Sequence, residues 1–327
     1  MTKREIFLTS FQKKLGSEFH GTQNWWTKSL FHFSDILNAI SILENASVYS
    51  RNRAIELDLM QNDNANNDVI ALTSDEHKNY ARLYFGPSTP TQKNNEGIKP
   101  ISEISNEAHC PIPVMFIFDF KKVFMLDGVL FTDGNLATNP NIYDDIQNLE
   151  ILNFHMIYHR TWFTPEHRNK IINARHSEVL VKDALQLENN LRLIAVRSEA
   201  EKETLLHQLS ATLKEKYKNK IYVQPQTGIF TNDWLYVDKV SLLNDTIHIK
   251  WHKCSNSISC NNQYNLKIVA RNEAENIVKT LAKNSWYPKD STQKINLTEE
   301  LKNIEFELEI YIDEIKVYVN KFGESIV

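Results

Sequence analysis

Three polar side chains in the sequence are of types that act in catalysis and substrate binding. They are His32, which stands between two phenylalanines, Arg82 in an aromatic string, and Glu178, which alternates with apolar residues. An imidazole can hold a hydroxyl group, a guanidinium matches a phosphate, and a carboxylate stabilises nearby positive charge. Each also has an ordinary explanation, because isolated histidines are mostly structural and strand residues such as Arg82 and Glu178 commonly face solvent. Seen alone, these residues leave both interpretations open.

A second group of candidate residues lies towards the C-terminal end of the sequence. His248, His252, Cys254 and Cys260 offer the imidazole and thiol donors that zinc prefers. Their spacing matches no strong zinc template, so we expect a hairpin with scattered histidines and no metal.

Basic and aromatic residues are mixed in two neighbouring stretches, 158–163 and 167–170. Such mixing suits a groove for single-stranded nucleic acid, in which bases stack on aromatic rings and basic groups contact phosphates. An ordinary surface loop explains the same composition, and the sequence does not distinguish the two.

The first two thirds of the sequence predicts a mixture of strands and helices. Ser34 is expected to cap a helix over 35–43, and Ser198 begins a capping box that opens a helix to about Tyr217. Residues 45–74 are rich in Asn and Asp, which predicts a long loop and a candidate lid. Strand composition is found at 25–33, 80–85, 113–118 and 177–181.

The rest of the sequence is mostly alternating and predicts strands. We expect a helix near 273–283 among strands at 234–243, 246–252 and 264–270 and a closing strand pair within 306–322. Strands that do not alternate regularly with helices favour an α+β class over a doubly wound parallel sheet, and the sequence has no glycine-rich phosphate loop. We predict one domain over 1–217 and a β-rich C-terminal extension, of a role that the sequence does not indicate, over 218–327.

The composition is that of a soluble globular protein. The chain has 327 residues, of which 42% are apolar, and a net charge of −4, so any nucleic acid must be bound by a local basic surface. A secretory stretch and an apolar run of membrane-spanning length are both missing from the sequence, and three cysteines are too few for a disulfide framework. We therefore expect a cytoplasmic protein without disulfides or a membrane partner.

Four short strings follow one another across residues 30–181. They are Phe-His-Phe-Ser-Asp at 31–35, Tyr-Ala-Arg-Leu-Tyr-Phe-Gly-Pro-Ser-Thr-Pro at 80–90, Phe-Thr-Asp-Gly-Asn-Leu-Ala at 131–137 and Arg-His-Ser-Glu-Val-Leu-Val at 175–181. In this order they resemble the motifs of DarT-like DNA ADP-ribosyltransferase toxins. The resemblance covers about half of the chain and implies an ADP-ribosyltransferase-like fold that cleaves NAD as its co-substrate and uses no metal.

The resemblance assigns the catalytic glutamate of the family to Glu178. Breaking the bond between nicotinamide and ribose places positive charge on the sugar, which a carboxylate stabilises. Arg82 is expected to be the catalytic arginine, with Arg51 and Arg53 as rivals, because thymine-modifying relatives are expected to carry theirs before the string that begins at Tyr80.

The resemblance also implies a cofactor pocket and an acceptor site. Tyr84 and Phe85 alternate across a strand, so at most one of them faces the pocket. Asp133 and Gly134 form either a plain turn or a contact with substrate. The expected cofactor-binding residues are His32, Ser34, Arg51, Tyr84, Phe85 and Thr89, and the expected substrate-binding residues are Arg160, Trp162 and Arg175.

The function implied is that of a toxin which transfers ADP-ribose to a base of single-stranded DNA, within a toxin–antitoxin or phage-defence system. A cognate antitoxin would remove the mark or block the cleft. Residues 89–92 and 95–97 resemble the guanine-modifying branch more closely than the thymine-modifying one. Two alternatives are a transferase acting on RNA or protein and a non-catalytic nucleic-acid-binding module on a transferase-like fold.

Overall fold

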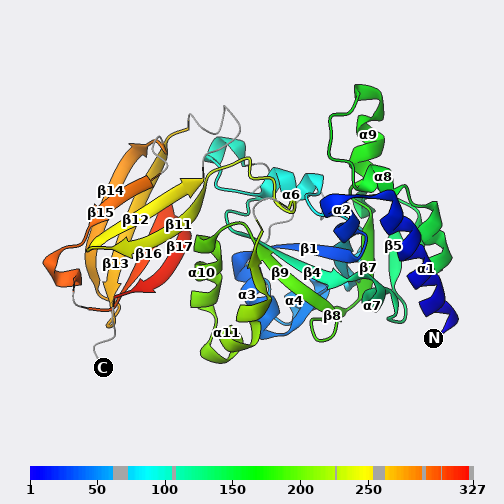
Figure 1. The fold of residues 1–327 in the computed structure, drawn as a ribbon, viewed down its shortest axis with the longest axis horizontal. Helices are drawn as coiled ribbons and strands as arrows, with labels where there is room; N and C mark the ends of the chain where they lie inside the picture. The colour runs from blue at the N-terminus through cyan, green and yellow to red at the C-terminus, as the bar shows by residue number, and fades with distance from the viewer. Residues whose placement is uncertain are drawn as a thin grey trace.

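The computed structural model describes residues 1–61, 73–104, 108–224, 227–252, 262–288, 292–302 and 304–323. In Figure 1 a larger domain of strands and helices carries the N-terminus, and a smaller domain made mostly of strands follows it. The class is α+β, as the sequence predicts.

The larger domain is built on one eight-stranded sheet with the order β10-β9-β4-β1-β3-β7-β5-β6. Its neighbouring strands are antiparallel except for the parallel pair β9 and β10. The strands are β1 (Ser29–Asp35), β3 (Tyr80–Tyr84), β4 (Pro113–Asp119), β5 (Leu130–Thr132), β6 (Ile142–Tyr143), β7 (Glu178–Lys182), β9 (Leu191–Val196) and β10 (Ile221–Val223). A separate small sheet pairs β2 (Ser47–Tyr49) with β8 (Ala184–Gln186).

Short helices surround this sheet, and α9 stands out from the body of the domain (Figure 1). The α-helices are α1 (Lys3–Glu18), α2 (Gly21–Trp26), α3 (Ile36–Glu44), α4 (Arg51–Glu56), α6 (Pro90–Asn95), α7 (Phe120–Phe124), α8 (Phe154–Ile157), α9 (Pro165–Ala174), α10 (Glu199–Gln208) and α11 (Ala211–Tyr217). The 3-10 helices are η1 (His77–Asn79), η2 (Ile101–Glu103), η3 (Leu136–Thr138), η4 (Ile146–Ile151), η5 (Lys218–Lys220) and η7 (Glu299–Leu301).

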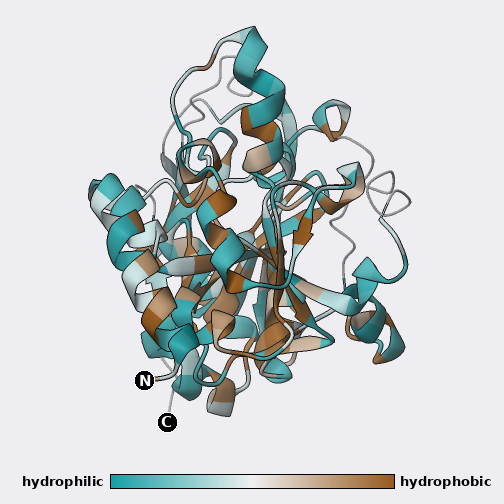
Figure 2. Cartoon of the chain, turned by 90° about the vertical axis from the view of Figure 1, so that its right-hand side faces the viewer, coloured by the Kyte–Doolittle hydropathy of each residue, from teal (hydrophilic) through white to brown (hydrophobic). Residues whose placement is uncertain are grey.

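The middle of the large sheet is buried on both faces. Every residue of β4 from Pro113 to Phe118 is buried, which is why this strand reads as a continuous apolar run. Apolar residues concentrate in the central strands and hydrophilic ones on the surrounding helices (Figure 2). Five phenylalanine rings, of Phe85, Phe120, Phe124, Phe131 and Phe154, pack against one another at centroid distances between 4.7 and 6.3 Å. This aromatic cluster holds β3 and β5 to α7 and α8.

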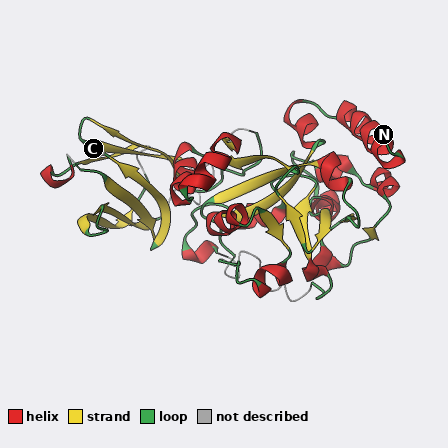
Figure 3. Ribbon diagram, turned by 90° about the horizontal axis from the view of Figure 1, so that it is seen from below, coloured by secondary structure: helices red, strands yellow, loops and turns green. Residues whose placement is uncertain are grey.

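The smaller domain consists of two antiparallel sheets around a second apolar core. One sheet has the order β11-β12-β15 and the other β14-β13-β16-β17. Figure 3 separates this strand-rich part from the mixed domain. The strands are β11 (Tyr236–Leu243), β12 (Thr246–His252), β13 (Tyr264–Asn272), β14 (Ile277–Trp286), β15 (Thr292–Asn296), β16 (Phe306–Ile312) and β17 (Ile315–Phe322).

A buried charge network joins the two domains at Arg197, which follows β9. Its guanidinium donates to the Glu201 carboxylate, with Nε and Oε1 2.9 Å apart, and its Cζ lies 4.5 Å from the centre of the Tyr236 ring. Glu96, also buried, has its Oε1 3.7 Å from Arg197 Nη1 and accepts from the backbone N–H of Thr231 at 3.0 Å. The Arg197 guanidinium is therefore the positive counter-charge of two buried carboxylates, those of Glu96 and Glu201.

Most of the predicted strands are confirmed with small shifts of their ends. The first one begins later than expected, at Ser29, because 21–26 form α2. Asp35 rather than Ser34 caps α3, since its carboxylate accepts from the Leu37 N–H at 3.0 Å. The predicted helix to Tyr217 is interrupted, because the Ser210 hydroxyl caps a second helix, α11, by accepting from the Leu213 N–H at 3.4 Å.

Two segment predictions need correction. The helix expected near 273–283 is wrong, because β14 pairs with β13 along its length and this tertiary pairing overrides helix-favouring composition. The long loop expected over 45–74 contains β2 and α4, and its Asn-rich part at 62–72 lies outside the described residues.

Residues beyond 217 still contribute to the larger domain. β10 extends its sheet, and Ile229 and Phe230 belong to its core. We propose that the domain boundary lies near 230 rather than at 217. No helix in the described ranges combines the length and apolar character needed to cross a bilayer.

Replacing Arg197 with Met is expected to lower the free energy of unfolding by about 3–5 kcal/mol, because two buried carboxylates lose their counter-charge. Chemical denaturation followed by tryptophan fluorescence measures the change. Arg53→Met is the control, since it removes only an exposed pair with Glu56 and should cost less than about 1 kcal/mol. Similar small losses in both variants would contradict a supporting role for Arg197.

Candidate active site

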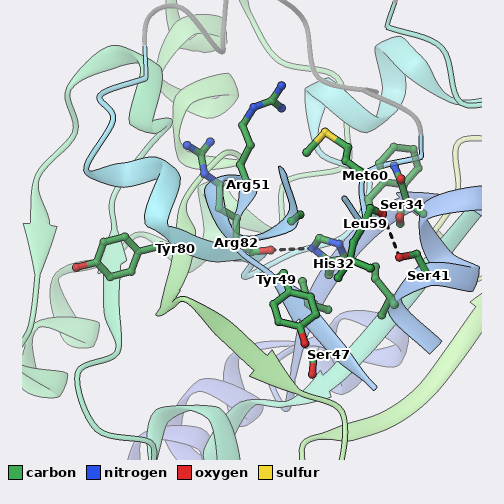
Figure 4. A pocket seen from close by; sticks show the side chains of 15 residues that line it. His32, Ser34, Ser41, Ser47, Tyr49, Arg51, Leu59, Met60, Tyr80 and Arg82 are labelled. Atoms are coloured by element: carbon green, nitrogen blue, oxygen red, sulfur yellow. Dashed lines mark hydrogen bonds between the residues drawn. The ribbon is translucent and has the colours of Figure 1, made fainter. Parts of the chain in front are cut away.

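A pocket of about 240 Å³ opens beside the central strands of the large sheet. His32 and Ser34 of β1, Arg51 of α4 and Tyr80 and Arg82 of β3 are among its lining residues (Figure 4). These residues come from three elements separated by up to 50 positions in the sequence, and the sheet order places β1 next to β3. The pocket therefore lies where the sequence strings at 31–35 and 80–90 meet in the fold.

The orientation of His32 is fixed by the neighbouring strand. Its Nδ1 donates to the backbone carbonyl oxygen of Arg82 at 2.9 Å. Burial lowers the pKa of His32, so the imidazole is neutral at pH 7. A neutral ring that carries its proton on Nδ1 presents Nε2 as a hydrogen-bond acceptor.

Glu178 is the first residue of β7 and is only 1% exposed. Its Oε2 has no hydrogen-bond partner among the described residues, and Arg82 Nε lies 3.8 Å from it. Burial raises the pKa of Glu178 to about 7, and the Arg82 guanidinium partly opposes this shift. A buried carboxylate with an unsatisfied oxygen is poorly suited to a structural role and well suited to binding a substrate.

Arg82 connects the two residues that the sequence singles out. Its carbonyl oxygen holds His32, and its guanidinium faces Glu178. β3 can do both because it lies between β1 and β7 in the sheet, with Phe31 opposite Tyr84 and Tyr84 opposite Glu178. The structure thus places His32 and Glu178 beside two different parts of Arg82, although the three residues are spread over 147 positions of the sequence. His32 and Arg82 line the pocket, whereas Glu178 is reached from it through Arg82.

The arginines that compete with Arg82 differ in position. Arg51 lines the pocket, and in Figure 4 its guanidinium lies on the same side of His32 as that of Arg82. Arg53 instead pairs with Glu56 on an exposed face of α4, at 3.0 Å. Two of the three candidates therefore lie at the pocket.

The side chains of Tyr84 and Phe85 point to opposite faces of the sheet, as the alternation along a strand requires. Tyr84 lies opposite Glu178 in the pairing of β3 with β7, and burial and then the Glu178 carboxylate raise the pKa of its hydroxyl. Tyr84 is not among the residues that line the pocket. Phe85 is fully buried in the aromatic cluster, so the expected cofactor contact at Phe85 is corrected to a core role.

The Thr89 side chain caps a helix. It is 3% exposed, and its hydroxyl accepts from the Gln92 N–H at 3.2 Å as the N-cap of α6. We therefore propose a helix-capping role for Thr89 in place of the expected cofactor contact.

Two of the three residues expected to bind the acceptor, Arg160 and Arg175, lie close enough for their charges to interact. The guanidinium of Arg160 lies 4.6 Å from the Trp26 ring centre and donates to the Gly228 carbonyl oxygen, and that of Arg175 donates to the Ser88 carbonyl oxygen. Neither has a carboxylate partner within the part of the chain that the structure describes. Burial, with Arg175 as a nearby like charge, lowers the pKa of Arg160 to about 10. Trp162 is 81% exposed beside them in sequence.

Sequence reasoning missed much of the pocket wall. Part of that wall comes from β2, a strand of only three residues whose pairing with β8 gives no local signal. The missed lining residues include Asn38, Ser41, Ser47, Tyr49 and Met60.

The C-terminal histidines do not form a metal centre among the described residues, where no group of three or more metal-ligating side chains occurs. His252 stacks on Tyr236 with a centroid distance of 4.3 Å, and its Nε2 donates to the Asn232 carbonyl oxygen at 3.1 Å. Cys254 and Cys260 lie outside the described residues.

A family model described as ssDNA thymidine ADP-ribosyltransferase, DarT, matches residues 31–236. This range is more than half of the chain and contains the pocket, Arg82 and Glu178. The chain belongs to the DarT family of NAD-dependent ADP-ribosyltransferases.

Three solved structures that resemble the chain come from the same family. Thermus sp. 2.9 DarT in complex with ADP-ribosylated ssDNA is 16% identical, with a TM-score of 0.49 over 61% of this chain and 95% of that one. The same protein in complex with NAD+ is 16% identical, with a TM-score of 0.47 over 61% and 96%. Thermosipho africanus DarTG in complex with ADP-ribose is 16% identical, with a TM-score of 0.45 over 67% and 54%. None of the curated proteins matches the chain.

Replacing Glu178 with Gln should stabilise the protein at pH 8. The carboxyl ionises near pH 4.5 when unfolded and near pH 7 when folded, so stability falls as pH rises between these values and the loss is complete above pH 7. The shift corresponds to roughly 3 kcal/mol, at about 1.4 kcal/mol for each pKa unit. Denaturation of both proteins should show a gain of this order at pH 8 and almost none at pH 4.

Glu188→Gln, at an exposed position, is the control and should leave the free energy of unfolding unchanged at both pH values. Equal stability of Glu178→Gln and the unsubstituted chain at pH 8 would show that Glu178 is not held in a desolvated site.

Proposed function

We propose that the chain cleaves NAD and transfers its ADP-ribose to a base of single-stranded DNA, as the toxin of a toxin–antitoxin or phage-defence system. The observation that carries the proposal is the Oε2 of the buried Glu178, which has no hydrogen-bond partner among the described residues and lies 3.8 Å from Nε of Arg82, a residue of the pocket wall. Family membership supports the reaction class, because the matching model is that of an ssDNA-modifying ADP-ribosyltransferase.

The residues present fit a dinucleotide co-substrate. The neutral Nε2 of His32 is an acceptor for a ribose hydroxyl, Ser34 adds a polar contact, and the guanidinium of Arg51 matches a diphosphate. NAD supplies the ribose–nicotinamide bond that is broken. The protein contributes binding and orientation on this side of the site, which is worth several orders of magnitude in rate when the geometry is right.

Glu178 is proposed to act at the bond that breaks. Departure of nicotinamide leaves an oxocarbenium-like sugar, and an ionised carboxylate in a site shielded from water stabilises it strongly. Arg82 is the proposed catalytic arginine, because its guanidinium is close enough to keep part of the Glu178 population ionised at neutral pH. The acceptor nitrogen can then pass its proton to the same carboxylate.

The acceptor strand is proposed to bind on the side of α9. Arg160 and Arg175 are like charges close enough to interact, and neither forms an ion pair among the described residues, so the two favour an anion such as a backbone phosphate. Trp162 offers an exposed ring on which a base can stack. This arrangement favours nucleic acid over protein as the acceptor.

We propose guanine as the acceptor base, although the family model is named for thymidine. The proposal rests on the strings at 89–92 and 95–97, which resemble the guanine-modifying branch. These residues lie in and around α6, whose Thr91 hydroxyl is 3.1 Å from Nε2 of His176, two residues before Glu178. Sequence differences in α6 can therefore affect the base that faces the catalytic carboxylate.

Incubation of the chain with NAD and matched DNA, RNA and protein acceptors tests the acceptor directly. Mass analysis of DNA oligonucleotides with a single guanine or a single thymine should find a gain of one ADP-ribose on the guanine oligonucleotide. Modification of thymine alone would overturn the guanine preference, and modification of RNA or protein alone would overturn the DNA acceptor.

An antitoxin partner is tested by co-expression of the chain with the genes that neighbour its own. The chain alone should arrest growth, and the antitoxin should relieve that arrest. Glu178→Gln is the control and should not arrest growth with or without the neighbouring genes. Normal growth of cells that express the unsubstituted chain alone would overturn the toxin role.

Glu178→Gln is expected to reduce transfer by at least about 100-fold, because an amide cannot stabilise the developing cation. In the unsubstituted chain, kcat/KM should rise with pH and level off above about pH 7, since the carboxyl must be ionised and its pKa is raised to about 7. Radiolabelled NAD and a guanine oligonucleotide measure both effects. A profile that is flat from pH 5 to pH 8 would contradict the role of Glu178.

Alanine at Arg160 or Arg175 is expected to weaken single-stranded DNA binding and to reduce the slope of log Kd against log salt by roughly 0.7 for each phosphate that is no longer bound. The KM for NAD should change little, because neither residue lines the pocket. Fluorescence anisotropy with a labelled oligonucleotide at several salt concentrations measures the slope. Arg53→Ala is the matched control, and a slope reduced equally by all three variants would argue against a specific phosphate site.

A further inference from the structure

A turn that connects β5 and β6 touches the backbone of the proposed catalytic glutamate. β5 pairs with β7 only at Leu130–Leu180 and Phe131–Val179, so the ladder ends one residue before Glu178. The backbone N–H of Glu178 donates instead to the side-chain hydroxyl of Thr132, at 3.0 Å. The first residue of β7 is therefore held by a side chain and not by a strand partner on this side.

The Thr132 hydroxyl has a fixed direction. It is fully buried, and it donates its single proton to the carbonyl oxygen of Gly134 at 2.7 Å. A hydroxyl that gives its proton to one group can only accept from the other. The two bonds together clamp the Glu178 N–H to the turn at 132–134.

The same turn is fixed from the side of α9. Asn173, in the last turn of α9, packs so closely on Gly134 that a Cβ there would lie 2.4 Å from its Nδ2. The Asn173 Oδ1 accepts from the Thr138 hydroxyl at 3.3 Å. Asn173 and Glu178 are five positions apart, so the chain on both sides of residues 174–177 is attached to one turn.

We propose that Thr132 is a positioning residue that holds the Glu178 carboxylate in register with the scissile bond. The inference rests on the proposed role of Glu178. A displaced carboxylate loses rate steeply, since an error of about 1 Å in a reacting group can cost on the order of 100-fold. The turn at 132–134 then acts through Thr132 on the position of Glu178, which is a different role from the plain turn and the substrate contact that the sequence left open.

The test compares Thr132→Val, which keeps the shape and removes the hydroxyl, with Thr132→Ser, which keeps the hydroxyl. Thr204→Val is the matched control. The Thr204 hydroxyl is buried, donates to the Ala200 carbonyl oxygen at 2.8 Å and accepts from the Val319 N–H at 3.3 Å, which is the same pair of bonds at residues that do not line the pocket. Both valine variants should lower Tm by comparable amounts.

The expected result is a fall in kcat of at least about 10-fold for Thr132→Val, with the KM for NAD within about twofold. In the pH profile of kcat/KM for Thr132→Val, the rise on the acidic side should move to lower pH. Burial raises the pKa of Glu178, and a less firmly held start of β7 would expose the carboxyl and lower that pKa. Thr132→Ser should restore both kcat and the pH profile. Thr204→Val should change neither after correction for the folded fraction.

The positioning role would be overturned if Thr132→Val had the same kcat and the same pH profile of kcat/KM as Thr204→Val. A Thr132→Ser variant as impaired as Thr132→Val would also overturn it, because the hydroxyl would then not be the active feature. Glu178→Gln separates this failure from that of the proposed function. An active Glu178→Gln variant overturns the proposed role of Glu178, whereas an inactive one beside a fully active Thr132→Val overturns the positioning role alone.

Discussion

The constraint on which the site depends is the burial of one carboxylate without a full set of partners. Glu178 is enclosed by the sheet, one of its oxygens has no hydrogen-bond partner among the described residues, and Arg82 supplies the nearby positive charge. Burying such a group costs stability, and folded chains keep this cost where it serves a function. The same desolvation that raises the pKa of Glu178 also strengthens its interaction with a developing cation. Stability and the proposed catalytic role are thus opposed at this position.

The sheet makes this arrangement possible through the order of three strands. β1 carries His32, β3 carries Arg82 and β7 begins at Glu178, and these strands are direct neighbours. The backbone of Arg82 fixes the imidazole while its side chain faces the carboxylate, so a shift of β3 would disturb both ends of the site. The smaller domain is joined to the larger one through the buried Arg197, and Glu96 connects that network to α6 because its Oε2 accepts from Nε2 of Gln92.

The sequence predicts well where local pattern and packing agree. The apolar run at 113–118 is a buried strand, and each of the four family strings starts or ends a strand of the large sheet. Prediction fails where a distant partner decides the structure. β14 has a helix-favouring composition but pairs with β13, β2 is too short to give a pattern, and Phe85 enters an aromatic cluster assembled from remote segments. The role proposed for Thr132 could not be predicted from the sequence for the same reason, since its partner Glu178 lies 46 positions away.

The ionisation state of the Glu178 carboxyl is the most direct test of this account. Carbon-13 NMR of protein labelled at the glutamate carboxyl, titrated from pH 3 to pH 9 without NAD and assigned with Glu178→Gln, reports that pKa separately from rate and stability. The account predicts a midpoint of about 7, set by burial. A midpoint close to the ordinary 4.5 of an exposed glutamate would contradict it, because the carboxylate would then be solvated and could not act as described.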